Sequence, residues 1–473
     1  MSAENELVLT DKQRTWIMTP LIIGGFIAML NETLLNVAFP QLMSDLNVST
    51  STVQWLSTAY VLVIGILVPV VAFLLKTFST RKLYLAAMLL FTAGTILCAI
   101  AQTFPALLVF RLVQGAGSGM MIPIMMNTVL EIYPPEKRGA ALGICMMVVV
   151  AAPGVGPAIS GLTLQYLNWH WLFIILLPFS LLAIFIGAAT IKNVTMLTCP
   201  KIDIPSIILS TLGFGGVIYG ICAIETKGLF DIIVFISLLC GIGSLVLFSI
   251  RQLSLKQPLL ELRVFKYPSF TLGVVIIFIA FMMPISVSII FPTFMQSGLG
   301  ISPAMAGFAV LPGSILNALI APISGRLCDK VGGKPLAIIG FSILTVAMFI
   351  LSHVSASVTL AELIILHICI FSGVSLIFTP IQTTSLNQLP SEYNPHGVAV
   401  LNTAQQISAA FGSSLFIGLM GTVQENYLET ITNPDTVQQC DALTHGMNAA
   451  FTASLVMVII GLGVSIFLKK KIE

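Results

Sequence analysis

The sequence predicts an all-α integral membrane protein, and three observations support this fold class. Of the 473 residues, 57% are hydrophobic and 8% are charged, whereas about 25% of the residues of a soluble domain are charged. The mean hydropathy is +1.02. The apolar residues form runs of roughly 20, the length of a helix that crosses a bilayer, and they do not alternate with period two as barrel strands do. This composition excludes a water-soluble enzyme or nucleic-acid-binding protein, because a soluble fold could not cover so much apolar surface.

Fourteen apolar segments of roughly 20 to 25 residues are long enough to span a bilayer. We expect the first of them to be retained rather than cleaved, because residues 1–15 are polar, carry no cleavable signal pattern and are followed by further spans. The predicted spans are residues 16–39, 52–75, 83–103, 105–130, 140–165, 171–191, 204–224, 230–250, 269–295, 303–325, 335–354, 358–386, 397–424 and 447–468.

The basic residues are concentrated in alternate connections between these spans. With a cytoplasmic N-terminus, the internal segments hold 19 of the 21 Lys and Arg residues; Lys227 is external and Arg111 lies within a span. Such an excess of positive charge marks the cytoplasmic side of a membrane protein. The sequence therefore predicts 14 spans with both termini in the cytoplasm. The longest external connection, about residues 424–446, is acidic and contains no Lys or Arg.

No motif for a primary energy source or for enzyme chemistry is present. A phosphate-binding loop needs Gly-x4-Gly-Lys-Ser/Thr; residues 115–119 are glycine-rich but lack lysine, and residues 332–334 (GGK) are followed by Pro335. The signatures DDxxD, HExxH and GxSxG are absent. The eight cysteines form neither a disulfide framework nor a paired-cysteine metal site. The sequence therefore argues against an enzyme, and we expect any transport to be driven by an ion gradient, with no cofactor and no metal.

Four stretches carry a resemblance to a known family. Leu107–Gly119 (LLVFRLVQGAGSG) resembles the fourth-helix motif of the major facilitator superfamily, and Pro153–Gly161 (PGVGPAISG) its fifth-helix antiporter motif, with Ser160 where a glycine is usual. Leu30–Pro40 (LNETLLNVAFP) is similar to a first-helix signature, and Gly325–Lys334 (GRLCDKVGGK) to the loop motif between the second and third helices of a half. Almost the whole chain resembles the fourteen-span drug:proton antiporter branch, the EmrB/QacA type. The Asn-Glu-Thr tripeptide of the first span is similar to the lincomycin-resistance LmrB-like subgroup.

The resemblance implies the major facilitator fold of two six-helix bundles. These would be residues 1–191 and 268–473, with an inserted two-helix hairpin and linker at 192–267. The loop motif lies between predicted spans ten and eleven, and its counterpart in the first half is Ala72–Lys82 (AFLLKTFSTRK), which has lost its glycines and carries Lys76 where the family has aspartate. Spans 9–14 are therefore expected to repeat spans 1–6.

Two charged residues within the spans are the predicted proton-coupling pair. Glu32 lies about sixteen residues, or roughly 24 Å, from the cytoplasmic end of the first span, and Arg111 about six residues, or roughly 9 Å, from the outer end of the fourth. In the superfamily fold these two helices are neighbours, so the resemblance implies that the side chains meet. The bilayer disfavours the carboxylate charge and a guanidinium favours it, so Glu32 could exchange a proton near neutral pH. The alternative is a structural ion pair that fixes the helix contact.

Three further groups of residues are predicted to line a substrate cavity, to control leak and exchange, and to form a loop latch. Polar residues within spans are candidates for lining a substrate cavity between the bundles: Asn31, Asn36, Gln54, Gln114, Asn317, Gln382, Asn402 and Gln405. The resemblance assigns control of leak and exchange to Pro153, Gly154, Gly156, Pro157 and Gly161 in the antiporter motif; generic helix packing is the alternative. It assigns a cytoplasmic loop latch to Gly325, Arg326, Asp329, Lys330 and Gly332.

Two other polar residues of the twelfth span receive less specific interpretations. Glu362 lies near the outer end and is expected to reach water. His367 is expected to be a hydrogen-bonded packing residue.

The predicted function is that of a proton-coupled multidrug efflux antiporter, which exports lipophilic drugs or antibiotics across a bacterial cytoplasmic membrane by alternating access. Its partners would be the lipid bilayer, small amphipathic substrates and protons, with no nucleic acid and no ATPase subunit, and a monomer would suffice. One alternative is a proton-coupled exporter of a single physiological metabolite. A membrane-embedded enzyme is the alternative from a different class.

Overall fold

The computed structural model describes residues 10–48, 50–193, 203–227, 231–255, 258–355, 358–429, 431 and 435–468. Within these residues the regular elements are helices, and no strand is present. The first half contains α1 (Asp11–Leu34), α2 (Phe39–Leu46), α3 (Thr50–Thr77), α4 (Thr80–Ala99), α5 (Phe104–Ile132), α6 (Pro135–Tyr166), α7 (His170–Ile174) and α8 (Leu176–Thr190). The middle of the chain forms α9 (Ile204–Lys227) and α10 (Ile232–Ser254). The second half contains α11 (Pro268–Thr293), α12 (Pro303–Val331), α13 (Gly333–Leu351), α14 (Leu360–Asn387), α15 (Asn394–Glu429) and α16 (Thr436–Ile466).

The prediction of an all-helical membrane protein is confirmed. In the described part of the chain, 12 helices are long and apolar enough to cross a membrane, or 13 if the bent α3 is one span. The two arms of α3, Trp55–Leu67 and Val70–Thr77, meet at 51°. The predicted count of 14 also requires α6, a 32-residue helix that packs beside α1 and α12. The 14-span count and the position of the termini stay predictions.

Several helices extend beyond the apolar runs, so the ends of these helices differ from the limits of the predicted spans. Helix α1 begins at Asp11 rather than residue 16, because Thr10 and Gln13 form a capping box at its start. Within the external connection predicted at residues 424–446, α15 continues to Glu429 and α16 begins after the capping residue Asp435. Hydropathy marks where a helix leaves the apolar layer, whereas side-chain capping decides where the helix ends.

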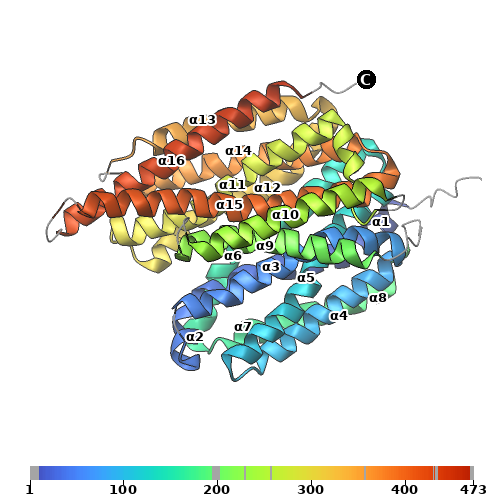
Figure 1. Cartoon of the computed structure of the whole chain (residues 1–473), viewed down its shortest axis with the longest axis horizontal. Coiled ribbons are helices and arrows are strands. Elements are labelled where there is room, and N and C mark those ends of the chain that lie inside the picture. The colour runs from blue at the N-terminus through green and yellow to red at the C-terminus, as the bar shows by residue number, and fades with distance from the viewer. Residues whose placement is uncertain are drawn as a thin grey trace, which may run out of the picture.

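The helices form two bundles with a helical hairpin against both (Figure 1). The first-half helices, blue to cyan, lie on one side and the second-half helices, yellow to red, on the other, with the green pair α9 and α10 between them in this view. Helix α6 packs along α12, and α3 packs along α15, which gives two contacts between the bundles. We call these the α6–α12 seam and the α3–α15 seam. Helix α9 packs against both α3 and α15 and therefore covers the second seam.

The start of α1 and the end of α16 lie at the same end of the molecule. The Arg14 guanidinium of α1 lies 5.6 Å from the ring centre of Tyr133, which follows α5. Across the bundles, Asp329 near the end of α12 accepts hydrogen bonds from the start of α6. The Lys334 ammonium at the start of α13 donates to the carbonyl of Ile466 at the end of α16, at 2.6 Å. This is the end that carries the basic connections.

Candidate functional site

A buried polar cluster in the first bundle is centred on Arg111 of α5. Its side chain is fully buried. The guanidinium lies 4.1 Å from the centre of the Tyr60 ring of α3, Nη1 donates to Oε1 of Gln114 at 2.9 Å, and Nε donates to the Leu56 carbonyl at 3.5 Å. Gln114 in turn donates to Oγ1 of Thr95 on α4 at 2.7 Å. A buried cation is tolerated when hydrogen bonds and an aromatic face replace its hydration, as they do here.

Tyr60 links three helices of this cluster. Its hydroxyl accepts a hydrogen bond from Nδ2 of Asn31 on α1 at 3.1 Å and lies 2.5 Å from Oγ of Ser118 on α5. It also approaches the Ala28 carbonyl at 3.4 Å. The sequence interpretation missed Tyr60 and Ser118. The available signal was a tyrosine deep within an apolar span, because a buried tyrosine hydroxyl needs a hydrogen-bond partner.

Glu32 follows Asn31 on α1, and its side chain is half-buried. The direct ion pair with Arg111 is not formed: among the described residues, the ion pairs within 4.0 Å do not include these two side chains. The physical reason is that the Arg111 guanidinium is turned toward α3, where it lies over the Tyr60 ring. The charges of Glu32 and Arg111 nevertheless act on each other. Nη2 of Arg111 is buried and has no hydrogen-bond partner in the described structure, so the guanidinium retains donor capacity for a ligand or carboxylate.

Two of the predicted cavity residues lie where the bundles meet. Gln382 of α14 and Asn402 of α15 are buried, and their amide nitrogens lie 3.1 Å and 3.8 Å from the sulfur of Met126 on α5. Asn402 also donates to the Val398 carbonyl at 2.9 Å. A soft thioether accepts such weak hydrogen bonds and adapts when its neighbours move. Met126 is therefore a contact between the bundles.

The remaining predicted cavity residues do not gather at one place. Gln114 belongs to the Arg111 cluster inside the first bundle. Asn317 is buried, and neither its amide oxygen nor its amide nitrogen has a partner in the described structure; the same holds for Nε2 of Gln405. The side chains of Asn36 and Gln54 lie outside the described residues.

The antiporter motif lies within α6, which continues unbroken from Pro135 to Tyr166. A Cβ added at Gly154 would lie 2.6 Å from the Cβ of Ser314 on α12, and one at Gly156 would collide with the Thr33 hydroxyl of α1. A Cβ at Gly161 would meet nothing within 4 Å. The first two glycines therefore permit close helix packing, as small residues do in membranes, while Gly161 does not serve this purpose. The side chains of Pro153 and Pro157 lie outside the described residues.

The loop motif forms a contact between the bundles. The carboxylate of Asp329 accepts hydrogen bonds from the backbone N–H groups of Gly139 and Ala140, at 2.9 and 3.0 Å, near the start of α6. A Cβ at Gly325 would collide with the carbonyl of Gly139. Gly332 has φ of 82°, a conformation that favours glycine and ends α12. The carboxylate of Asp329 thus makes a contact at the start of α6, which the helix dipole reinforces.

A further hydrogen bond across the bundles lies close to the Asp329 contact. Nη1 of Arg138, at the start of α6, donates to Oδ1 of Asn387 at the end of α14, at 3.1 Å. The sequence-predicted latch residues Arg326 and Lys330 are exposed at this end of the molecule. We call the Asp329 and Arg138 contacts together the basic-end latch.

Glu362 and His367 of α14 occupy different environments. Glu362 is exposed and forms the capping box of the helix, accepting from the Thr359 N–H and hydroxyl at 2.8 and 3.0 Å. His367 is buried, with its ring 4.4 Å from that of Phe371 and 5.6 Å from that of Phe291. The first is an interfacial residue and the second packs against aromatic rings.

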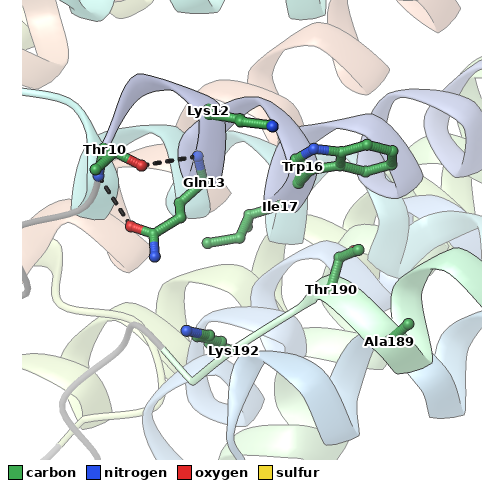
Figure 2. Close-up of a pocket in the computed structure, with 8 residues that line it drawn as sticks. All are labelled: Thr10, Lys12, Gln13, Trp16, Ile17, Ala189, Thr190 and Lys192. Carbon is green, nitrogen blue, oxygen red and sulfur yellow. Dashed lines mark hydrogen bonds between the residues drawn. The ribbon is translucent and has the colours of Figure 1, made fainter.

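A cavity of about 320 Å³ lies outside this site, between the start of α1 and the end of α8. Figure 2 shows Thr10 and Gln13 joined by the two capping hydrogen bonds, with Trp16, Ile17 and Lys192 on the other sides of the cavity. None of the predicted site residues lines it. In the described part of the chain, no group of three His, Cys, Asp or Glu residues is placed to hold a metal ion.

Comparison with known proteins decides the family. Residues 21–413 match the Major Facilitator Superfamily. The chain belongs to this superfamily. It is a multi-pass membrane transporter and not an enzyme.

Curated relatives and solved structures agree with this assignment. The chain is 46% identical to the lincomycin resistance protein LmrB of Bacillus subtilis over 457 residues, which cover 96% of this chain and 95% of the relative. It is 29% identical to the probable multidrug resistance protein EmrY of Escherichia coli, over 86% of this chain and 80% of that one. The structure of the proton:xylose symporter XylE superposes with a TM-score of 0.67 at 14% identity, covering 98% of this chain and 97% of that one. The XylE comparison supports the fold alone.

Proposed function

We propose that this transporter is a proton-coupled multidrug efflux antiporter of a bacterial cytoplasmic membrane, and that lincomycin or related lipophilic antibiotics are among its substrates. The observation that carries this proposal is the 46% identity to the lincomycin resistance protein over 96% of the chain. The more distant identity to a multidrug resistance protein supports a broad substrate range. The chain is proposed to need no ATPase subunit or cofactor.

Glu32 is the proposed proton carrier, and the Arg111 cluster sets its environment. The side chain of Glu32 is half-buried on α1. The preceding residue, Asn31, is hydrogen-bonded to Tyr60, and the charge of Arg111 acts on the Glu32 carboxyl group. A proton from outside would neutralise Glu32 and end its attraction to Arg111, which favours release of the substrate outward. Loss of the proton to the cytoplasm would restore the carboxylate and reset the cycle. Each charge that crosses the membrane contributes about 2.3 kcal/mol per 100 mV, which supports uphill export.

The basic-end latch supports alternating access as the mechanism. Asp329 and Arg138 hold the two bundles together at the end with the basic connections. Rocking of one bundle against the other would have to break these contacts before a substrate could enter from that side. The Met126 contacts with Gln382 and Asn402 also lie between the bundles and would separate in the same movement.

Proton-driven export can be tested in everted membrane vesicles with an acidic interior and a pH-sensitive dye. Addition of lincomycin, of unrelated lipophilic drugs and of candidate metabolites should each be followed by dye recovery if the compound is exchanged for protons. We expect recovery with several lipophilic compounds for the wild type, and its loss in Glu32→Gln. Glu362→Gln is the matched control, because it removes the same charge from an exposed capping residue.

The outcomes of this experiment separate the candidate functions. Recovery with a single metabolite would replace multidrug export by specific export. Uphill export that persists in Glu32→Gln would contradict the role of Glu32, and absence of recovery with every compound would contradict proton-coupled export.

A further inference from the structure

The cavity between the start of α1 and the end of α8 is lined by two lysines. Figure 2 shows that Lys12 reaches it from α1 and Lys192 from the segment that follows α8. None of the described residues that line the cavity is acidic. Asp11, which precedes Lys12, is paired with Arg14 at 3.0 Å. The cavity is therefore positively charged and attracts an anion.

The two ammonium groups keep their donors for a ligand. In the described part of the chain, the ion pairs include neither Lys12 nor Lys192. At the same end of the molecule, Lys334 instead donates to the Ile466 carbonyl at 2.6 Å. An ammonium group carries three N–H donors. Because Lys12 and Lys192 line one cavity, both can donate to the same anion.

Gln13 adds an uncharged donor to this cavity. Its Oε1 accepts a hydrogen bond from the Thr10 N–H at 3.0 Å, and its own N–H donates to the Thr10 hydroxyl at 3.3 Å. This capping box holds the amide by its oxygen, so the Nε2 group remains as a donor. The Thr190 hydroxyl already donates to the Ile186 carbonyl at 2.8 Å. The donors for an anion are therefore the two lysines and Gln13.

The cavity lies at the boundary of the apolar layer. The apolar run of α1 begins at Trp16, about one helical turn after Lys12, and that of α8 ends at Ile191, directly before Lys192. The Trp16 side chain is 51% exposed at the cavity, and tryptophan is enriched at the level of the lipid headgroups. This is the end that carries the basic connections, which the predicted topology places at the anionic cytoplasmic leaflet.

An apolar strip leads from the cavity into the hydrocarbon layer. Ala189 lines the cavity, and Phe185 and Leu182 precede it on α8 at the spacing of one helix face. Their side chains are 72% and 49% exposed. A free inorganic anion would gain nothing from this strip, whereas a phospholipid could lay an acyl chain along it. The strip therefore favours a lipid as the source of the anion.

We propose that this cavity binds the phosphate headgroup of an anionic phospholipid, with an acyl chain along the exposed face of α8. Basic pockets between membrane helices on the cytoplasmic side are suited to such headgroups. The volume of about 320 Å³ lies at the lower limit of small-molecule pockets, about 300–1,000 Å³, which fits a headgroup whose chains stay outside. The inference does not depend on which compound the transporter exports. A bound headgroup would join the start of α1, the helix that carries Glu32, to the end of α8.

Binding can be tested by acetylating the lysines of the full-length protein in lipid nanodiscs and locating the products by mass spectrometry. The probe is phosphatidylglycerol added to phosphatidylcholine, which has the same phosphodiester but a choline cation that cancels its charge. We expect phosphatidylglycerol to slow the acetylation of Lys12 and Lys192 at least about fivefold, which corresponds to lipid at about four times its Kd. Lys266, an exposed residue just before α11, is the internal control and should change little.

Single variants test whether the two lysines share one lipid. In Lys192→Gln the protection of Lys12 by phosphatidylglycerol should be largely lost, and in Lys12→Gln that of Lys192. Lys266→Gln is the matched control, because it removes the same charge from an exposed residue outside the cavity. It should leave both protections unchanged. All three lysines are exposed, so we expect each variant to keep the wild-type unfolding temperature in phosphatidylcholine.

Four results would overturn the proposal. Equal slowing at Lys266 would mean general attraction of lipid to the basic surface, and equal protection by phosphatidylcholine alone would mean that the anionic charge is not recognised. Undiminished protection of Lys12 in Lys192→Gln would mean that the lysines do not share a ligand. Inorganic phosphate that protects Lys12 and Lys192 as strongly as phosphatidylglycerol would mean that a free anion, and no lipid, occupies the cavity.

Discussion

The two seams between the bundles are built from equivalent helices of the two halves but held together differently. At the α6–α12 seam the backbones approach closely: a Cβ at Gly143 would lie 2.6 Å from the Ala321 carbonyl, and Gly325 touches Gly139. At the α3–α15 seam a third helix, α9, packs against both partners, with Ile218 of α9 filling the space beside Gly65 of α3. One contact is therefore made by small residues, whereas in the other the direct packing of α3 on α15 is supplemented by a helix of the inserted hairpin.

The two seams also differ in charge at the end of the molecule that carries the basic connections. Asp329, near the end of α12, caps the start of α6. The corresponding position near the end of α3 is Lys76, and the negative charges that act on it are those of Glu392, just before α15, and Glu261. The second helix of each half, α3 or α12, thus faces the start of the fifth helix of the other half, α15 or α6. The charged residue near the end of this second helix is positive in α3 (Lys76) and negative in α12 (Asp329). In the first half, where Lys76 stands in place of the aspartate of the loop motif, the opposing side carries an acidic group.

The largest effect is expected from Asp329→Ala. This change removes the carboxylate that accepts hydrogen bonds from the Gly139 and Ala140 N–H groups, and the loss of a hydrogen bond to a charged group costs about 1.5–3 kcal/mol. We expect amide hydrogen exchange at residues 139 and 140 to accelerate about 10- to 100-fold, since each 1.4 kcal/mol corresponds to a factor of ten. Asp329→Asn retains one acceptor oxygen, so its exchange rates at residues 139 and 140 should lie between those of the wild type and of Asp329→Ala. Unchanged exchange at these amides would show that the latch does not hold the bundles together.

Gly325→Ala is expected to have the next largest effect. The new methyl group would collide with the backbone carbonyl of Gly139, which cannot rotate away as a side chain could, and such overpacking costs about 1–3 kcal/mol. The thermal unfolding temperature in detergent should fall. Gly161→Ala is the matched control, because nothing lies within 4 Å of its added Cβ and alanine favours a helix over glycine by about 1 kcal/mol. Equal unfolding temperatures for the two variants would refute the close packing of this seam.

A smaller effect is expected where Lys76 faces Glu392. Glu392 is exposed and Lys76 half-buried, and exposed charge pairs contribute about 0.2–1 kcal/mol. A double-mutant cycle on thermal stability should show Lys76→Glu and Glu392→Lys each destabilising alone and partly restoring each other together. The effect should weaken in high salt. Strict additivity of the two changes would mean that the charge reversal between the halves has no structural consequence.

Some of these features could be predicted from the sequence and others could not, because some are set by composition or a motif and others by contacts that form only in the folded chain. Apolar run length predicted the helical membrane fold, and the Gly325–Lys334 motif located the latch. The partner of Arg111 could not be predicted, because its guanidinium lies over Tyr60, which is distant in sequence and has no charge to suggest a pairing. The start of α16 could not be read from hydropathy for the opposite reason: its capping by Asp435 is a local interaction that a hydropathy profile does not register. Contacts between bundles, such as that of Met126 with Gln382, require the three-dimensional packing itself.

The smallest effect is expected from lowering the pH, which acts on the Asp203–Arg251 ion pair at the base of the α9–α10 hairpin. Nε and Nη2 of Arg251 donate to the Asp203 carboxylate at 2.8 and 2.7 Å, and these hydrogen bonds lower the pKa of Asp203 below its ordinary value. A carboxyl group with a lowered folded-state pKa stabilises the fold above its unfolded pKa and loses this contribution as the pH falls through the lowered value. The difference in unfolding temperature between wild type and Asp203→Asn should therefore be small and constant from pH 6 to 8, and it should shrink progressively as the pH falls below about 4. A difference that persisted in acid would have to come from the shape of the side chain or from its contact with Ser206 rather than from its charge. The hairpin would then be held on the seam by packing against α3 and α15 without help from this ion pair.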